Sequence, residues 1–188
     1  MKKILFLGYN SKKTRLIKYL KKNHKVTVYG QKEITKEFVK NYDLLISFGY
    51  KKIIRENVLK SLKRPGINLH ISYLPYNRGA HPNFWSFIDR TPKGVSIHEI
   101  NTRVDAGNII KRKKIDFKLS KNLTFEQTYK KLIIEIEKFF IKYHESIIEG
   151  KYRSIVIKKK GTIHKRRDLP KNIVKWNIKI QSYLEKLI

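Results

Sequence analysis

The feature that most constrains the fold is an alternation of short apolar runs with helical patterns. The apolar runs cover residues 3–7, 26–28, 43–49 and 67–70, and amphipathic segments stand between them. Apolar residues follow one another within each run, which is typical of strands that are buried on both faces. This β-α-β-α-β-α-β order predicts an α/β fold, with a Rossmann-like, mostly parallel sheet and helices on both faces.

The segments between and beyond these strands predict further elements. Residues 33–41 and 53–62 carry apolar residues at helical spacing and predict two short helices. Residues 94–100 and 108–115 predict two strands that extend the sheet in the antiparallel sense.

A long helix is predicted for residues 124–149. Thr124 and Gln127 have the spacing of a capping box, and Gly150 is well placed to end the helix. An apolar stripe that includes Tyr129 runs along it, and we expect this stripe to pack in the core.

The chain beyond residue 150 differs in composition. Residues 152–157 predict a strand, residues 158–167 contain six Lys and Arg, and residues 172–188 predict an amphipathic helix that carries Trp176. We therefore expect a catalytic domain in residues 1–150 and a basic C-terminal appendage in residues 151–188. The Trp176 helix can form an interface or cap the core, so a homodimer is compatible with the sequence.

The charge of the chain has two interpretations. The formal net charge is +29 in 188 residues. It fits a polyanionic partner such as nucleic acid, an anionic membrane surface or a phosphorylated substrate. It also fits a compositional bias, because lysine is spread along the whole chain together with abundant isoleucine.

Composition also bears on the compartment. Cysteine is absent, which excludes disulfides and thiolate zinc sites and fits a reducing compartment. The apolar run at the N-terminus has only four residues, too few for a signal-peptide core or a membrane span. We expect a cytoplasmic protein.

Polar residues gather near the end of the fourth strand. Asn68 and His70 stand two residues apart and therefore point to the same face of that strand. Ligands of parallel α/β sheets bind beyond the carboxyl ends of the strands, where these side chains lie. Asp105 follows on a turn between two predicted strands. An amide, an imidazole and a carboxylate can together stabilise an oxyanion and move a proton.

Residues 66–110 resemble the core of the formyltransferases that use 10-formyltetrahydrofolate. That core runs Asn-x-His-x-Ser-x-Leu-Pro-x-x-[Arg/Lys]-Gly, then Gly-Val-[Thr/Ser]-[Ile/Val]-His, then Asp-x-Gly-x-[Ile/Leu]. The matching residues, in order, are Asn68, His70, Ser72, Leu74, Pro75, Arg78 and Gly79, then residues 94–98, then Asp105, Gly107 and Ile109. The resemblance covers residues 43–115 well and the first strand and helix loosely.

The resemblance implies a formyltransferase fold and formyl transfer from 10-formyltetrahydrofolate to a primary amine, without a metal. It implies that Asn68, His70 and Asp105 are the catalytic residues. The folate pocket is expected to consist of Phe48, Gly49, Tyr50, Lys51, Lys52, Ile53, Ile54, Arg103 and Val104.

Three branches of the family compete for the amine substrate. Methionyl-tRNA formyltransferases carry an additional tRNA-binding domain, for which about 38 residues after Gly150 are too few, so nucleic acid is not expected as a partner. Glycinamide ribonucleotide formyltransferases have a glycine-rich first loop, whereas residues 8–11 contain one glycine. Residues 71–85 and 161–164 look most like the enzymes that formylate amino sugars on nucleotide carriers for surface polysaccharides.

The sugar branch is therefore favoured, with a phosphate-bearing nucleotide sugar as the amine substrate. The strand–glycine–helix turn at Gly8 is either an ordinary βα turn, which is favoured, or a phosphate site formed by Ser11, Lys12 and the helix N-terminus. We expect the amine substrate to contact Ser11, Tyr76, Asn77, Arg78, Gly79, Trp85 and His164. The alternative from a different class is a basic nucleic-acid-binding protein without catalysis on the same fold.

Overall fold

A six-stranded sheet forms the centre of the computed structural model, which describes residues 1–118, 120–171 and 173–187. The strand order is β2-β1-β3-β4-β6-β7. The first four strands of this order pair in parallel, and β6 and β7 are added by antiparallel pairing. The predicted parallel sheet with an antiparallel extension is confirmed.

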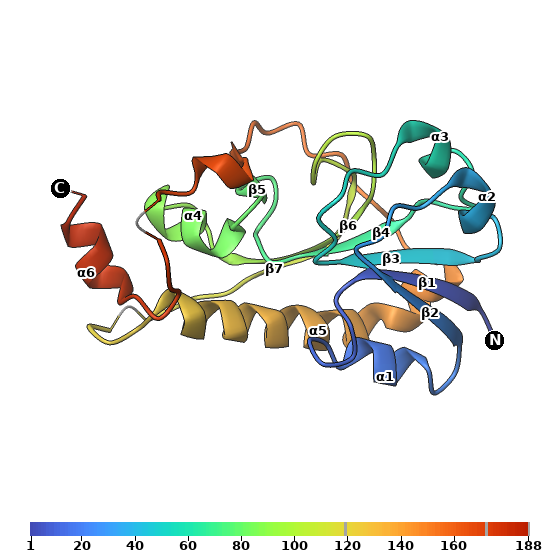
Figure 1. Cartoon of the computed structure of the whole chain (residues 1–188), viewed down its shortest axis with the longest axis horizontal. Coiled ribbons are helices and arrows are strands. Elements are labelled where there is room, and N and C mark those ends of the chain that lie inside the picture. Colours follow the sequence, from blue (N-terminus) through green and yellow to red (C-terminus); the bar gives the residue numbers. More distant parts are fainter. Residues whose placement is uncertain (119, 172, 188) are drawn as a thin grey trace.

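Figure 1 shows how the helices and strands are arranged around this sheet. They are β1 (Lys3–Gly8), α1 (Leu16–Leu20), β2 (Lys25–Gly30), α2 (Lys36–Val39), β3 (Leu44–Phe48), α3 (Glu56–Leu59), β4 (Ile67–His70), β5 (Arg78–Gly79), α4 (Pro82–Ile88), β6 (Gly94–Glu99), β7 (Ile109–Lys114), α5 (Phe125–Glu149), β8 (Ile163–His164), the 3₁₀ turn η1 (Arg166–Asp168) and α6 (Ile180–Glu185).

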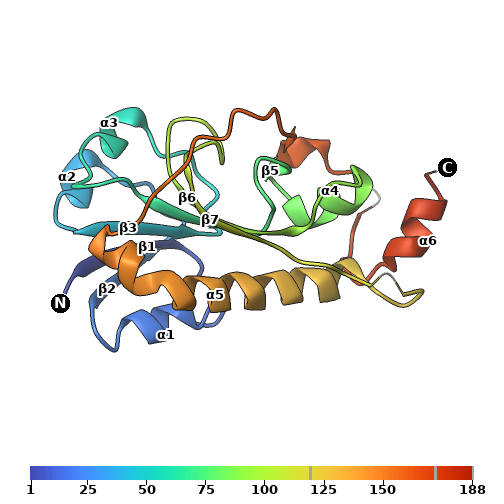
Figure 2. The ribbon, with the colours of Figure 1, turned by 180° about the vertical axis from the view of Figure 1, so that it is seen from behind.

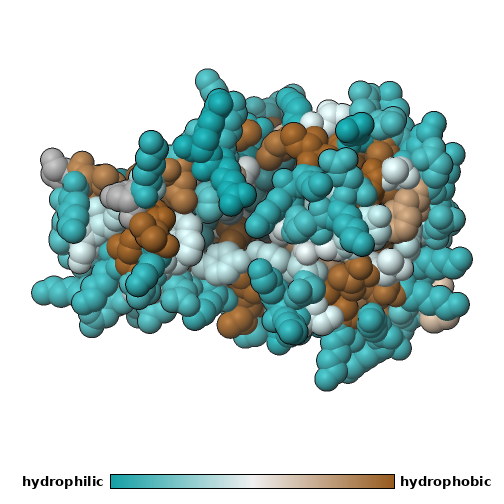
Figure 3. All heavy atoms as spheres, viewed as in Figure 1, coloured by the Kyte–Doolittle hydropathy of each residue, from teal (hydrophilic) through white to brown (hydrophobic). Residues whose placement is uncertain are grey.

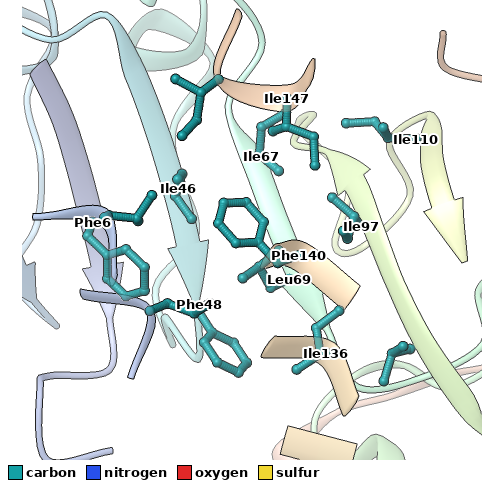
Figure 4. Packing of buried hydrophobic residues seen from close by; sticks show 14 of the residues in the cluster. Phe6, Ile46, Phe48, Ile67, Leu69, Ile97, Ile110, Ile136, Phe140 and Ile147 are labelled. Carbon is teal, nitrogen blue, oxygen red and sulfur yellow. The ribbon is translucent and has the colours of Figure 1, made fainter. Parts of the chain in front are cut away.

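Helices cover both faces of the sheet, as the apolar strands predict. Helices α1 and α5 lie on one face and α2 and α3 on the other (Figures 1 and 2). The larger core packs sheet residues such as Phe48 and Leu69 against Ile136 and Phe140 of α5 (Figure 4). Burying a side chain of this size contributes about 1.5–3 kcal/mol, so α5 fixes the sheet on which the site is built.

Helix α5 has the predicted capping box and end. The Thr124 hydroxyl accepts from the N–H of Gln127 at 3.2 Å, and the Gln127 side chain accepts from the N–H of Thr124 at 3.0 Å. Gly150 ends the helix in the left-handed region, with φ 72°. The helices predicted in residues 33–41 and 53–62 are shorter than expected, at four residues each.

The tail differs most from its prediction. Residues 152–157 make a single bridge, between Ile155 and Ile109, instead of a strand. The helix predicted for residues 172–188 is restricted to α6, while Asn172 and Ile188 lie outside the described residues.

Trp176 precedes α6 because its stretch of chain binds the first turn of α5. The N–H of Glu126 donates to the carbonyl of Trp176 at 2.7 Å, and that of Phe125 to the carbonyl of Ile178 at 3.2 Å. The first N–H groups of a helix have no partner within it. An extended tail supplies these acceptors, whereas a helical one would not.

No helix in the described residues is long and apolar enough to cross a membrane.

Candidate active site

Asn68, His70 and Asp105 meet at the carboxyl end of β4. The Asn68 Nδ2 atom donates to Asp105 Oδ1 at 2.9 Å, and His70 Nδ1 lies 3.6 Å from Asp105 Oδ2. The expectation that the strand spacing and the distant turn converge on one spot is confirmed. A fourth side chain joins them, since His98 lies opposite Asn68 in the antiparallel pair of β4 and β6.

Asp105 is held by the backbone of β5 as well as by side chains. The N–H of Gly79 donates to Asp105 Oδ2 at 2.9 Å. Asp105 itself has a φ of 45°, and a Cβ atom at Gly107 would collide with the carbonyl oxygen of Glu99. The glycine of the Asp-x-Gly motif therefore lets the turn fold back closely enough to aim the carboxylate.

Two opposing effects act on the Asp105 carboxyl. Burial raises its pKa, but the His70 and His98 rings and the N–H of Gly79 outweigh burial and hold the pKa well below its usual range. Asp105 is therefore a carboxylate, buried so that only 14% of its side chain is exposed. A fixed negative charge stands at the centre of the site.

The hydrogen bonds of the two histidines determine which ring nitrogen carries a proton. His70 Nε2 lies 3.1 Å from the carbonyl oxygen of Asn77, and His98 Nδ1 lies 2.7 Å from that of Glu99. A carbonyl only accepts, so both of these nitrogens donate. In its neutral form, His98 is then an acceptor at Nε2, where Asn68 Nδ2 donates to it at 3.0 Å.

The Asn68 amide is fully oriented by this arrangement. Its Nδ2 donates to both Asp105 and His98. An inverted amide would set its oxygen against the Asp105 carboxylate, so the observed orientation is the favourable one.

A cavity of about 1310 Å³ surrounds these residues. Figure 3, in the same view as Figure 1, shows the surface hollowed near the middle of the molecule, with apolar residues deep in the hollow. All nine residues expected to contact folate line the cavity: Phe48, Gly49, Tyr50, Lys51, Lys52, Ile53, Ile54, Arg103 and Val104.

These residues suit a ligand that is apolar at one end and anionic at the other. Ile53 is 73% exposed and Val104 41% exposed, which leaves apolar surface open to a flat ligand. Gln31 stiffens the wall, because its amide donates to the carbonyl of Gly49 and accepts from the N–H of Lys51, both at 2.8 Å. The lysines and Arg103 offer charge to a carboxylate.

The structure places some of the residues expected to bind the amine substrate at the cavity and others away from it. Gly79 and His164 line the cavity. Five others do not line it: Ser11, Tyr76, Asn77, Arg78 and Trp85.

Each of these five has another place in the fold. Ser11 is exposed on the turn after β1, and Tyr76 lies beneath Lys159, whose Nζ is 5.5 Å from the ring centroid. Arg78 pairs with the tail through its backbone. Asn77 is completely buried, and the Trp85 ring stacks on that of His164 at 4.0 Å. Residues 76–78 and Trp85 thus lie outside the cavity, whereas the residues between them, 79–84, line it.

Sequence reasoning missed several lining residues. Tyr9 and Tyr129 line the cavity, and their hydroxyls lie 2.7 Å apart. Tyr129 was expected in the core, but it is 38% exposed. His81 also lines the cavity and stacks on Trp176, with ring centroids 5.4 Å apart. Only tertiary folding brings these rings together, so no spacing in the sequence indicates them.

The cavity is strongly cationic. Among the described residues that line it, the acidic ones are Asp105 and Glu126, and seven are basic: Lys51, Lys52, Arg103, Lys130, Lys165, Arg166 and Lys175. No group of three His, Cys, Asp or Glu side chains suited to a metal ion occurs in residues 1–118, 120–171 and 173–187.

Comparison with known proteins assigns the family. A family model described as formyl transferase matches residues 10–143, which is more than half of the chain. The chain belongs to the formyl transferase family. The resemblance noted in residues 66–110 is thereby confirmed, as is the formyltransferase fold.

Among solved formyl transferases, PseJ from Anoxybacillus kamchatkensis is similar over its whole length. Its crystal structure, in complex with UDP-4,6-dideoxy-4-formamido-L-AltNAc and tetrahydrofolate, matches with a TM-score of 0.87 at 36% identity. The match covers 99% of this chain and 100% of that chain.

Curated relatives extend beyond the part that matches. The bifunctional polymyxin resistance protein ArnA of Wigglesworthia glossinidia brevipalpis is 30% identical over 162 residues, which are 82% of this chain and 24% of that protein. The dTDP-4-amino-4,6-dideoxyglucose formyltransferase of Mycobacterium tuberculosis is 27% identical over 132 residues, or 70% and 55%. This chain therefore spans about a quarter of the first relative and about half of the second.

Proposed function

We propose that this formyl transferase moves the formyl group of 10-formyltetrahydrofolate to the primary amine of a nucleotide-linked amino sugar, for surface polysaccharide synthesis. The observation that carries the proposal is the position of Asn68, His70 and Asp105 inside one cationic cavity. The family's co-substrate supplies the formyl group, and the positive charge favours an acceptor that bears phosphate.

The nature of the acceptor is supported by the comparisons. PseJ, which matches the whole chain, is bound to a UDP-linked 4-formamido sugar in its crystal structure. The Mycobacterium tuberculosis relative is named for a dTDP-linked 4-amino sugar. A nucleotide sugar with an amine on its pyranose ring is therefore the acceptor that we propose.

In the reaction that we propose, the amine nitrogen bonds to the formyl carbon, and the bond from that carbon to the folate nitrogen breaks. One proton leaves the amine and one reaches the departing nitrogen, so the atoms balance. After the amine nitrogen has bonded and before the folate nitrogen departs, negative charge develops on the formyl oxygen. Asn68 and His70 are the proposed donors to that oxygen, and losing one such donor costs about 3 kcal/mol.

The resting hydrogen bonds indicate how Asn68 becomes available. Both of its amide hydrogens are engaged, one by the Asp105 carboxylate and the other by His98 Nε2. When His98 is in its neutral form, the bond that Asn68 donates to it is the weaker of the two, because hydrogen bonds to charged groups are roughly twice as strong. The developing oxyanion can therefore replace His98 as the acceptor of this Asn68 hydrogen bond, while the bond to Asp105 keeps Asn68 oriented.

Asp105 has two proposed tasks. Its charge lies 3.6 Å from Nδ1 of His70 and stabilises the positive charge that develops on this ring during proton transfer, and it steers protons between amine and folate through a water molecule. We further propose the cytoplasm as the location and a homodimer as the assembly, in line with the absence of cysteine and with the exposed Trp176 beside the cavity.

The test is turnover with a panel of amines. Purified protein is mixed with 10-formyltetrahydrofolate and UDP- or dTDP-linked 3-amino and 4-amino sugars, glycinamide ribonucleotide or methionyl-tRNA. Mass spectrometry should detect an amino sugar that has gained one CO group, with release of tetrahydrofolate. Formylation of the ribonucleotide or the tRNA alone would contradict the sugar assignment. Salt-dependent RNA binding without transfer to any amine would contradict the enzyme assignment.

A further inference from the structure

The short segment 77–79 touches two of the proposed catalytic residues. His70 Nε2 donates to the carbonyl of Asn77 at 3.1 Å, and the N–H of Gly79 donates to Asp105 at 2.9 Å. These are backbone groups, so the placement of the imidazole and the carboxylate depends on the path of the chain through this segment. A strand of two residues, β5, has little stability of its own.

The C-terminal tail fixes that path. Strand β8 pairs in parallel with β5, and the N–H groups of Arg78 and Ala80 donate to the carbonyls of Thr162 and His164 at 3.0 and 2.8 Å. The Thr162 hydroxyl also accepts from the N–H of Asn77 at 2.8 Å. A Cβ atom at Gly79 would collide with the His164 carbonyl oxygen, so the pairing requires glycine there.

A buried polar network locks the same segment from its other side. Asn77 is completely buried and has a left-handed backbone with φ 55°, a conformation that Asn adopts more readily than most other residues and that its side-chain contacts hold in place here. Its side chain accepts from the Thr91 hydroxyl at 2.7 Å and donates to Asp89 at 3.2 Å. Asp89 in turn lies 2.7 Å from Nε2 of His164, which brings the network back to the tail.

We propose that Thr162 and the tail strand position His70 and Asp105 for catalysis through the segment 77–79. Thr162 does not line the cavity, so it acts as a positioning residue rather than through substrate. Without its hydroxyl, the N–H of a fully buried residue has no acceptor, and the chain shifts to relieve this loss. The kinetic part of this inference depends on the proposed function.

The kinetic test compares two substitutions of one residue. Thr162→Val keeps the shape and removes the acceptor, whereas Thr162→Ser keeps the acceptor. We expect Thr162→Val to lower kcat roughly tenfold, since a small misplacement of catalytic groups is costly. KM for folate and for the amino sugar should change little, and Thr162→Ser should restore kcat. A valine variant with the kcat of the wild type, or a rise in KM alone, would overturn the proposal.

An independent readout needs no substrate. In ¹⁵N-edited NMR of the full chain, the Nε2–H of His70 should give a slowly exchanging signal that Thr162→Ser retains and Thr162→Val broadens or loses. If no amine is formylated but the signal behaves in this way, the positioning stands and the proposed function fails. An unchanged signal in Thr162→Val would refute the positioning.

A second variant covers the case in which Thr162→Val does not fold. Thr91→Val removes the hydroxyl that donates to the Asn77 side chain at the other side of the same segment, and Thr91 does not line the cavity around the catalytic residues. Circular dichroism checks that the variant is folded. We expect kcat and the His70 signal to change in the same direction, and two unchanged readouts would overturn the proposal.

Discussion

Replacing Asp105 with asparagine removes the negative charge from the centre of the site. The side chains have the same shape, and an asparagine oxygen can still accept from the N–H of Gly79, which now lies 2.9 Å from the carboxylate. The change therefore removes the negative charge while keeping the backbone contact that aims residue 105. Two things are lost: the attraction between this charge and the positive charge that develops on His70 during proton transfer, and the acceptor of the Asn68 amide, which then faces the new Nδ2.

The size of the first loss follows from the geometry. At 3.6 Å between His70 Nδ1 and Asp105 Oδ2, two unit charges attract by about 4–5 kcal/mol at an effective dielectric constant of about 20. Both side chains are more than four-fifths buried, so water screens the pair little. Each 1.36 kcal/mol corresponds to about a tenfold change in rate, and we therefore expect kcat to fall roughly 10³-fold.

The assay is steady-state release of tetrahydrofolate with the acceptor found in the amine panel. Asp116→Asn is the matched control, because it makes the same chemical change at an exposed carboxylate outside the cavity. Folate binding and circular dichroism should be unchanged in both variants. If folded Asp105→Asn keeps more than about a tenth of the wild-type kcat, the charge contributes less than 1.36 kcal/mol and this reasoning is wrong.

Three other perturbations test the structure in the same manner. Folding lowers the pKa of Asp105, so its charge stabilises the fold above the usual Asp pKa of about 4, and this stabilisation is lost as pH falls towards the folded-state pKa. In acid titrations, the free energy of unfolding of Asp105→Asn should therefore fall less than that of the wild type between about pH 5 and pH 3. Parallel pH curves for the two proteins would contradict this. Phe140→Ala should lower the free energy of unfolding in urea by about 3–5 kcal/mol, since the ring is completely buried, whereas Ile134→Ala on the exposed face of the same helix should cost far less. Arg166→Ala removes a cation from the cavity lining and should raise KM for the nucleotide sugar but not for folate, and equal effects on both would place the phosphate elsewhere.

The parts of the fold that the sequence predicts well are those with a strong local pattern. Continuous apolar runs mark strands that must be covered on both faces, and the buried strand β3 matches its prediction closely. The capping box at Thr124 and Gln127 defines the start of α5, since both halves of the motif are side-chain bonds to nearby backbone. Asn68 and His70 converge because strand geometry places alternate residues on one face.

The tail is the part that local patterns cannot predict. Residues 173–179 have the spacing of a helix, yet their carbonyls serve the free N–H groups of Phe125 and Glu126, and this tertiary demand overrides helical propensity. His164 and Trp85 were both expected at the substrate, but they stack on one another at 4.0 Å, and only His164 reaches the cavity. Pairing of β5 with β8 spans more than eighty residues of chain, for which a single sequence carries no signal.

The two proposed walls of the cavity differ in how freely their residues can be substituted. The proposed folate wall consists mainly of consecutive residues, 48–54, next to the strand that carries Asn68, so altering it alters the approach to the catalytic groups. The proposed acceptor wall is assembled from the tail, where Lys165, Arg166 and Lys175 lie on surface segments. Substitutions at those positions change the fit of an acceptor while the contacts of Thr162 with the segment 77–79 keep His70 and Asp105 in place. One set of catalytic groups can thus serve different amines, provided that the strand pairing behind it is kept.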